Sequence, residues 1–367
     1  MKTQAFLLFS LLAITSAPAW SQAKNIILFV GDGAGISSLN AASISGYGAP
    51  QALYVQKMPH LALVDTSTAK EWVTDAAACA TAWATGHKGR NGVVSMSPDA
   101  ERDVRNGEIY KTVMEQAMEQ GLSTGVISND SAAAAIIAAF YAHDNNRGKF
   151  GEIFQQALHP KFGSGPDVII GAGRKVIDDQ TTALGHNLAA DVKAGGYAYV
   201  DSMAALSALD KNNGRVVALF DDQQFDFNAA VQQAVARLSK NPKGFLLVAH
   251  SDCHTGKTRS SLQRILDLDK AIAAAGEQLK SDTLILFTAD HSYDLRIKGE
   301  TLTETSKASD HTKIGSIVSL EDEHTAEEVP LLGMGPGSEK ISGFISNTDV
   351  FGIMMQAFGW KTEQARR

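Results

Sequence analysis

Residues 72–86 read WVTDAAACATAWATG, in which a polar Thr-Asp pair precedes a run of small residues that ends at a glycine. High helix propensity over this run, Asp75 as a capping residue and Gly86 as a stop predict a helix that the chain enters from a loop. Free backbone N–H groups and the positive end of the dipole attract anions to the start of such a helix. We therefore expect an anion site at Ala76, where this helix begins.

The composition of the chain is that of a globular protein with one large core. It has 367 residues, of which 44% are hydrophobic and 20% are charged. Apolar, strand-like segments alternate with helical ones, so we expect an α/β fold with a large, mainly parallel central sheet and helices on both faces, in one domain over residues 24–367. The formal net charge of -7, without a block of Lys and Arg, disfavours a nucleic-acid partner.

The N-terminal segment has the composition of a secretory signal peptide. An apolar run, Ala5–Ile14, is followed by small residues, which predicts a signal peptide over residues 1–23 and a secreted or periplasmic protein. The run is too short to span a bilayer, which takes about 20 residues, so no membrane span is expected. Cys79 and Cys253 are the only cysteines. We favour two buried thiols over a pair that approaches a functional site.

Three apolar runs, residues 25–30, 244–249 and 283–288, predict buried strands. Potential metal ligands follow these runs: Asp32 after the first; His250, Asp252 and His254 after the second; Asp290 and His291 after the third. The carboxyl ends of parallel strands meet at one edge of a sheet, where α/β proteins place their sites. Residues two apart in an extended segment share a face, which suits a ligand set. Capping and turn roles remain the alternative for these polar residues.

Several of these stretches resemble motifs of the alkaline phosphatase family, over the chain from Asn25 to about Gly359. The similar segments are GDGAG at 31–35, matching D-G-[AM]-G; VTDA at 73–76, matching V-T-D-S; AHDNNR at 142–147, matching A-H-x-x-x-R; and TADH at 288–291, matching T-A-D-H. The resemblance implies that Asp32, Asp290 and His291 bind one zinc ion. It also implies that Asp75 belongs to the catalytic loop and that Arg147 clamps phosphate oxygens, for which its planar fork is suited.

The ligands of the other zinc ion depend on the alignment. In the family, the strand corresponding to residues 244–249 ends in a Glu that supports a third metal, and D-x-x-x-H follows. Aligning strand ends puts His250 at the Glu position and leaves Asp252 and His254 as zinc ligands, which we prefer. The rival alignment puts His250 in place of the Asp. For the last ligand we choose His324, in a segment similar to H-x-A-x-x-[VI]-P, over His311.

Three positions depart from the family together. Ala76 replaces the nucleophilic Ser, Ile136 replaces a hydroxyl that supports the third metal, and His250 replaces its carboxylate. The resemblance therefore implies two Zn²⁺ ions. It also implies that the third site of the family, which binds Mg²⁺, is lost or altered here, because the imidazole of His250 suits zinc better than magnesium. We expect hydrolysis of phosphate monoesters by direct attack of a zinc-bound hydroxide, in one displacement.

The alternative is a catalytically impaired family member that binds metal, or phosphate, without efficient turnover. In either case the ligand is a phosphate ester or inorganic phosphate. A homodimer is compatible with the sequence.

Overall fold

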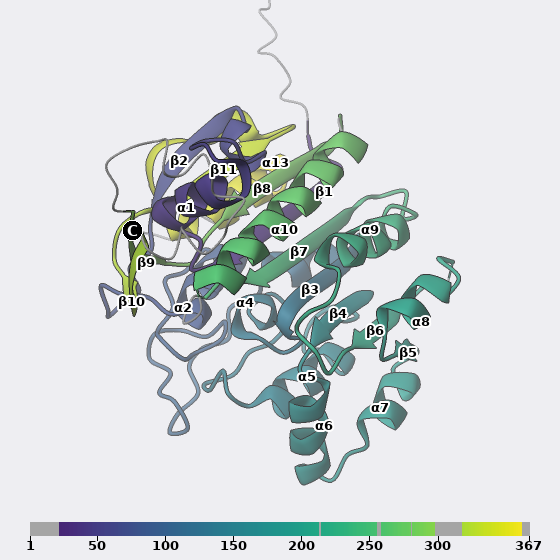
Figure 1. The fold of residues 1–367 in the computed structure, drawn as a ribbon. Helices are drawn as coiled ribbons and strands as arrows, with labels where there is room; N and C mark the ends of the chain where they lie inside the picture. The colour runs from purple at the N-terminus through teal and green to yellow at the C-terminus, as the bar shows by residue number, and fades with distance from the viewer. Residues whose placement is uncertain (1–21, 213, 255–257, 280, 298–317, 362–367) are drawn as a thin grey trace, which may run out of the picture.

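The computed structural model describes residues 22–212, 214–254, 258–279, 281–297 and 318–361 (Figure 1). A ten-stranded sheet has the strand order β12-β2-β11-β8-β1-β7-β3-β4-β6-β5, and β9 pairs with β10 in a separate two-stranded sheet. The strands are β1 (Asn25–Asp32), β2 (His60–Asp65), β3 (Ser123–Ser131), β4 (Val168–Ala172), β5 (Ala198–Val200), β6 (Val216–Leu219), β7 (Phe245–Asp252), β8 (Thr283–Thr288), β9 (Ser292–Ile297), β10 (Val318–Thr325), β11 (Val329–Met334) and β12 (Ser342–Ser346). The helices are α1 (Ile36–Tyr47), α2 (Ala76–Thr85), α3 (Val113–Glu119), α4 (Ala135–Ala138), α5 (Phe150–Leu158), α6 (Arg174–Ala183), α7 (Leu188–Ala194), α8 (Met203–Ala208), α9 (Phe227–Leu238), α10 (Thr258–Gln278) and α13 (Asn347–Ala357), with 3-10 turns at Val55–Lys57 and Ser338–Lys340.

The centre of the sheet is parallel, as predicted. β1 pairs in parallel with β7 on one side and with β8 on the other, and β3 pairs in parallel with β7. In this register Asp32 lies beside Asp252, and His250 lies between Val30 and Ser128. Only β11 runs antiparallel to its neighbours among the described strands of the large sheet. The carboxyl ends of β1, β7 and β3 are therefore level, and β8 ends beside them.

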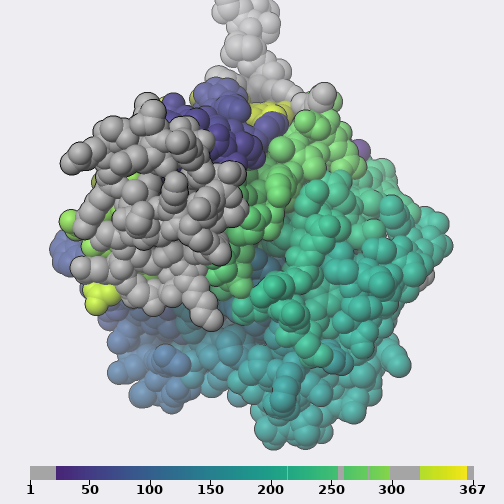
Figure 2. Space-filling model, viewed as in Figure 1, coloured from purple at the N-terminus to yellow at the C-terminus, as the bar shows by residue number. Residues whose placement is uncertain are grey.

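Helices cover both faces of the sheet. α9 and α10 pack against each other and over β1, β3 and β7, on the side that faces the viewer in Figures 1 and 2. α2, α3, α4 and α13 pack together on the other side. Of the helices described, none combines the length and the hydropathy that crossing a bilayer requires. The sheet residues between these layers, among them Leu28, Leu247 and Leu286, are fully buried.

Two segments differ from the sequence-based expectation. A helix is expected over residues 108–120, but α3 begins only at Val113, because Thr112 and Glu115 form a capping box there. Residue 109 instead forms an isolated bridge with residue 96. The span 174–214, which has no clear pattern in the sequence, contains α6, α7, β5 and α8.

Cys79 and Cys253 are both free and buried, as expected for thiols that act as small apolar side chains.

Gly244 generates a stability prediction for the entry of β7. Its φ is +105°, and a Cβ atom there would lie 1.9 Å from the carbonyl oxygen of Lys24. We expect Gly244→Ala to lower the free energy of unfolding by more than about 2 kcal/mol, because both strain and overlap oppose it. Gly352, in α13, is the matched control, since a Cβ there meets nothing within 4 Å. Gly352→Ala should raise stability by roughly 0.5–1 kcal/mol in the same urea titration, and equal effects would contradict the argument.

Candidate metal centre and anion site

The predicted helix of the anion site is α2, and its ends are formed as expected. Asp75 is the N-cap, with Oδ1 accepting the N–H of Ala78 at 2.9 Å, and Gly86 ends the helix in the left-handed conformation. Oδ2 of Asp75 accepts a hydrogen bond from Nη1 of Arg147, also at 2.9 Å. Arg147 is therefore held at the start of α2. Ala76, the first residue of the helix, is buried.

Three buried side chains converge where β1 and β8 end. Asp32, Asp290 and His291 each offer one ligand atom, and these atoms lie within 4.8 Å of one another. Nε2 of His291 is 3.3 Å from Oδ1 of Asp32 and 3.4 Å from Oδ2 of Asp290, but without hydrogen-bond geometry. All three atoms lack a hydrogen-bond partner among the described residues. Because buried polar atoms without partners are costly, this donor set fits a bound cation.

A second group consists of three imidazoles. His254, His291 and His324 also offer ligand atoms within 4.8 Å of one another. The rings of His291 and His324 are stacked with centroids 3.5 Å apart, and those of His254 and His324 are 5.5 Å apart. His254 follows β7, whereas His324 lies on β10 opposite Tyr293 of β9. The two-stranded sheet thus brings one imidazole to the edge of the large sheet.

Each of these three imidazoles uses its Nδ1 atom elsewhere. The Nδ1 contacts are Asp252 Oδ1 for His254 (2.9 Å), the Ser292 carbonyl for His291 (3.2 Å) and the Thr74 carbonyl for His324 (3.2 Å). Carbonyl and carboxylate oxygens only accept, so each Nδ1 carries a hydrogen, and in the neutral ring the lone pair is on Nε2. Metal-bound histidines are oriented by outer contacts of this kind. The tautomers therefore fit metal ligation through Nε2.

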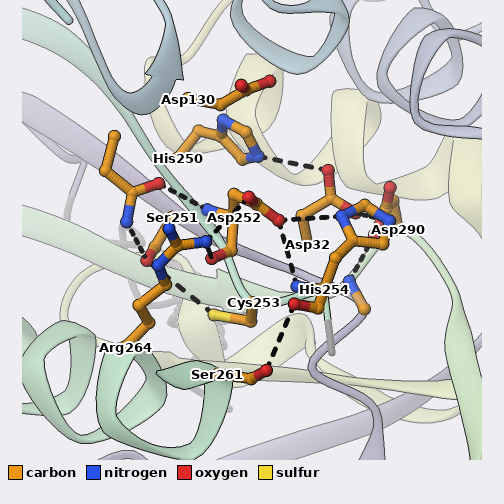
Figure 3. A network of polar contacts seen from close by, with 12 residues as sticks. Asp32, Asp130, His250, Ser251, Asp252, Cys253, His254, Ser261, Arg264 and Asp290 are labelled. Carbon is orange, nitrogen blue, oxygen red and sulfur yellow. Dashed lines mark hydrogen bonds and ion pairs between the residues drawn. The ribbon is translucent and has the colours of Figure 1, made fainter. Parts of the chain in front are cut away.

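The structure does not bring Asp252 into either group, although it is a predicted zinc ligand (Figure 3). Its Oδ1 accepts from His254, and its Oδ2 accepts from Nη1 of Arg264, on α10, at 2.8 Å. The same Nη1 donates to the carbonyl of Asp252 at 2.9 Å. Sequence reasoning does not single out Arg264, because no motif marks an arginine inside an amphipathic helix. The ion pair turns Asp252 toward α10.

His250 also lies outside both groups, although the sequence places it at the position of a third-metal ligand. It is 1% exposed, and its ring faces Asp32 on one side and Ser128 on the other. Asp130, on β3, lies near the ring (Figure 3). Ile136 is buried in α4. His311, the rival of His324, falls outside the described residues.

The carboxylates of the site have opposite pKa shifts. Burial opposes ionisation of Asp32, but the charge of His254 and the hydrogen bond with His250 outweigh it, so the pKa lies well below its usual range. Burial and the charge of Asp32 raise the pKa of Asp290 to about 6. Burial also opposes protonation of His254, yet Asp32 and Asp252 raise its pKa to about 10. Ionisation of Asp290 is therefore opposed by burial and by Asp32, and a cation would relieve this cost.

Comparisons with known proteins agree with the motifs. The family model described as Alkaline phosphatase matches residues 23–316. Alkaline phosphatase of Escherichia coli (strain K12) is 29% identical, over 92% of this chain and 87% of that protein. The tissue-nonspecific isozyme of alkaline phosphatase from Rattus norvegicus is 28% identical, over 89% of this chain and 73% of that protein.

Solved structures of similar proteins show the same fold. Thermus thermophilus alkaline phosphatase has a TM-score of 0.80 at 19% identity, over 93% of this chain and 92% of that chain. A TAB5 alkaline phosphatase mutant, which has Mg bound in its M3 site, has a TM-score of 0.77 at 24% identity. The match covers 94% of this chain and 100% of that chain. The family and the fold support a phosphoesterase function and a metal-dependent enzyme. The family model matches most of the residues of this chain, which shows that the chain belongs to the alkaline phosphatase family.

Proposed function

We propose that this protein is a zinc-dependent phosphoester hydrolase that acts on phosphate monoesters with water as the direct nucleophile. The observation that carries the proposal is the convergence of three buried, unpartnered atoms, on Asp32, Asp290 and His291, beside two further imidazoles. The apolar segment before residue 24 supports export, with residues 1–23 as the signal peptide that is removed.

The donor chemistry fits two zinc ions. Asp32, Asp290 and His291 would hold one ion, and His254 and His324 would hold the other through Nε2. Imidazole and carboxylate are both ordinary zinc ligands, and a zinc ion with few protein ligands keeps a position open for water or substrate. Asp252 would act on the second ion through His254, because the hydrogen bond to Nδ1 fixes the orientation and tautomer of the ring.

Arg147 and the start of α2 would bind the phosphate. The guanidinium is held by Asp75 and also interacts electrostatically with Asp32 and Asp290. Burial opposes its charge, but Asp75 outweighs burial and raises the pKa of Arg147, so the side chain stays cationic. A cationic fork and free backbone N–H groups together suit the non-bridging oxygens of a phosphate group.

Ala76 decides the number of chemical steps. A methyl group cannot accept a phosphoryl group, so the residue at the head of α2 leaves space for a smaller nucleophile. When bound, the ions supply Lewis acidity and lower the pKa of water towards about 7. Arg147 would meanwhile stabilise the charge that develops on the phosphate oxygens. One displacement at phosphorus follows, without a phosphorylated protein.

Metal content gives the first test. We expect purified protein to carry two zinc ions and no tightly bound magnesium, as measured by elemental analysis. Removing the ions with a chelator leaves Oδ1 of Asp32 and Oδ2 of Asp290 without a hydrogen-bond partner among the described residues. The Tm should fall by roughly 10 °C, by linkage for an ion bound well above its Kd. Zn²⁺ should restore it and Mg²⁺ alone should not; stoichiometric magnesium on protein side chains would contradict the assignment.

Replacing Arg147 tests the phosphate clamp. We expect Arg147→Lys to weaken binding of inorganic phosphate at least tenfold by calorimetry, because Lys lacks the planar fork and loses one charge-assisted hydrogen bond. Arg174, which pairs with Asp221 on the surface, is a matched control. Arg174→Lys should leave phosphate binding unchanged. Equal affinities of wild type and Arg147→Lys would place the phosphate elsewhere.

The stereochemistry at phosphorus tests the single displacement. With a substrate made chiral at phosphorus, the natural protein should give inversion, because one in-line displacement inverts and two retain. Ala76→Ser should allow a phosphorylated serine to be trapped at low pH, whereas wild type and Ala76→Gly should not. Net retention by the natural protein would refute direct attack by water. A large gain of activity in Ala76→Ser from an undetectable level would instead favour the catalytically impaired family member.

A further inference from the structure

His250 is buried on β7, in the middle of the large sheet. It lies on β7 with Val30 of β1 and Ser128 of β3 as its register neighbours. Nε2 lies 3.2 Å from Oδ2 of Asp32, and Nδ1 lies 2.9 Å from Oγ of Ser128. Both ring nitrogens are therefore engaged. In this respect His250 differs from His254, whose Nε2 lies 3.2 Å from Oδ1 of Asp32 but without hydrogen-bond geometry.

The direction of these hydrogen bonds follows from their partners. An ionised Asp32 only accepts, so Nε2 of His250 carries a hydrogen. Oγ of Ser128 already accepts the N–H of Asp130 at 3.1 Å, so the Ser128 hydroxyl can donate its own hydrogen to Nδ1. Each ring nitrogen of His250 thus has a hydrogen-bond partner, and neither offers a free lone pair to a metal ion.

The contact with His250 separates the two oxygens of Asp32. Oδ2 accepts a hydrogen bond from Nε2 of His250. Oδ1 has no hydrogen-bond partner among the described residues, and it faces the imidazoles of His254 and His291. A carboxylate that is fixed at one oxygen presents the other in a defined direction. Outer contacts of this kind influence metal affinity by about 10–100-fold.

We propose that His250 is a positioning residue for Asp32 and not a ligand, so that a hydrogen-bonded imidazole occupies the place of a third cation. The inference rests on the metal centre proposed above. Asp130 and Asp252 are the other acidic residues that act on His250. Neither of the ligand groups found among the described residues includes Asp130 or His250. The hydrogen bonds from Asp130 through Ser128 and His250 to Asp32 therefore account for this position without an ion.

Metal titration of three proteins tests this assignment: wild type, His250→Gln and His250→Leu. Glutamine keeps an N–H donor of similar reach but is a poor zinc ligand, and leucine removes both hydrogen bonds at similar volume. Wild type and His250→Gln should both bind two zinc ions, with affinities within about threefold in competition with a chromophoric chelator. His250→Leu should still bind two ions, one of them about 10–100-fold more weakly.

A third ion in wild type that is lost in His250→Gln would overturn the proposal, as would unchanged affinities in a folded His250→Leu protein. If His250→Leu does not fold, as judged by circular dichroism, wild type and His250→Gln still decide between two and three ions. The titration does not depend on turnover. A protein that binds two ions and hydrolyses no phosphate ester would contradict the proposed hydrolysis and leave this inference standing.

Discussion

Asp32 ends β1, and Asp290 comes two residues after the end of β8, which pairs with β1 in parallel. The hydrogen-bond ladder that builds the centre of the sheet therefore forces two carboxylates together at a buried position. Burying two like charges is unfavourable, and the raised pKa of Asp290 beside Asp32 reflects this. Cationic or hydrogen-bonding groups must compensate them. Much of the surrounding arrangement, from His254 to Arg147, follows from this requirement.

Outer contacts fix the side chains around these carboxylates. Asp252 holds His254 and is itself held by Arg264, so a surface helix, α10, extends its influence to an imidazole of the site. The backbone carbonyl of Thr74 holds the ring of His324 through its Nδ1 atom. Asp75 joins the start of α2 to Arg147, so the anion site and its cation are positioned by one carboxylate. Preorganised groups of this kind need little rearrangement when charge develops on a substrate.

The sequence was sufficient for the fold, and it named the side chains that the structure brings together in the two ligand groups. Apolar runs predicted β1, β7 and β8, and the helix signals predicted α2 with both of its ends, because these features depend on local composition. The side-chain directions after β7 could not be predicted. Spacing and the alignment with the family predicted Asp252 and His250 as ligands. Their hydrogen-bond partners, Arg264 and Ser128, come from α10 and β3 and could not be inferred from the local sequence. The start of α3 was misplaced, because the capping box at Thr112 outweighs the helical pattern before it.

His324 is the one imidazole of the site that does not follow a strand of the large sheet, since it lies on β10 in the separate β9–β10 hairpin. The two proposed ions consequently differ in what their binding must organise. Asp32, Asp290 and His291 are carried by β1 and the end of β8, so their geometry exists once the sheet is formed. An ion held by His254 and His324 would link the hairpin to the sheet, and part of its binding free energy would offset the cost of that docking. The two ions should therefore leave the protein in a fixed order, and loss of the hairpin-linked ion should loosen β9 and β10 before the core is affected.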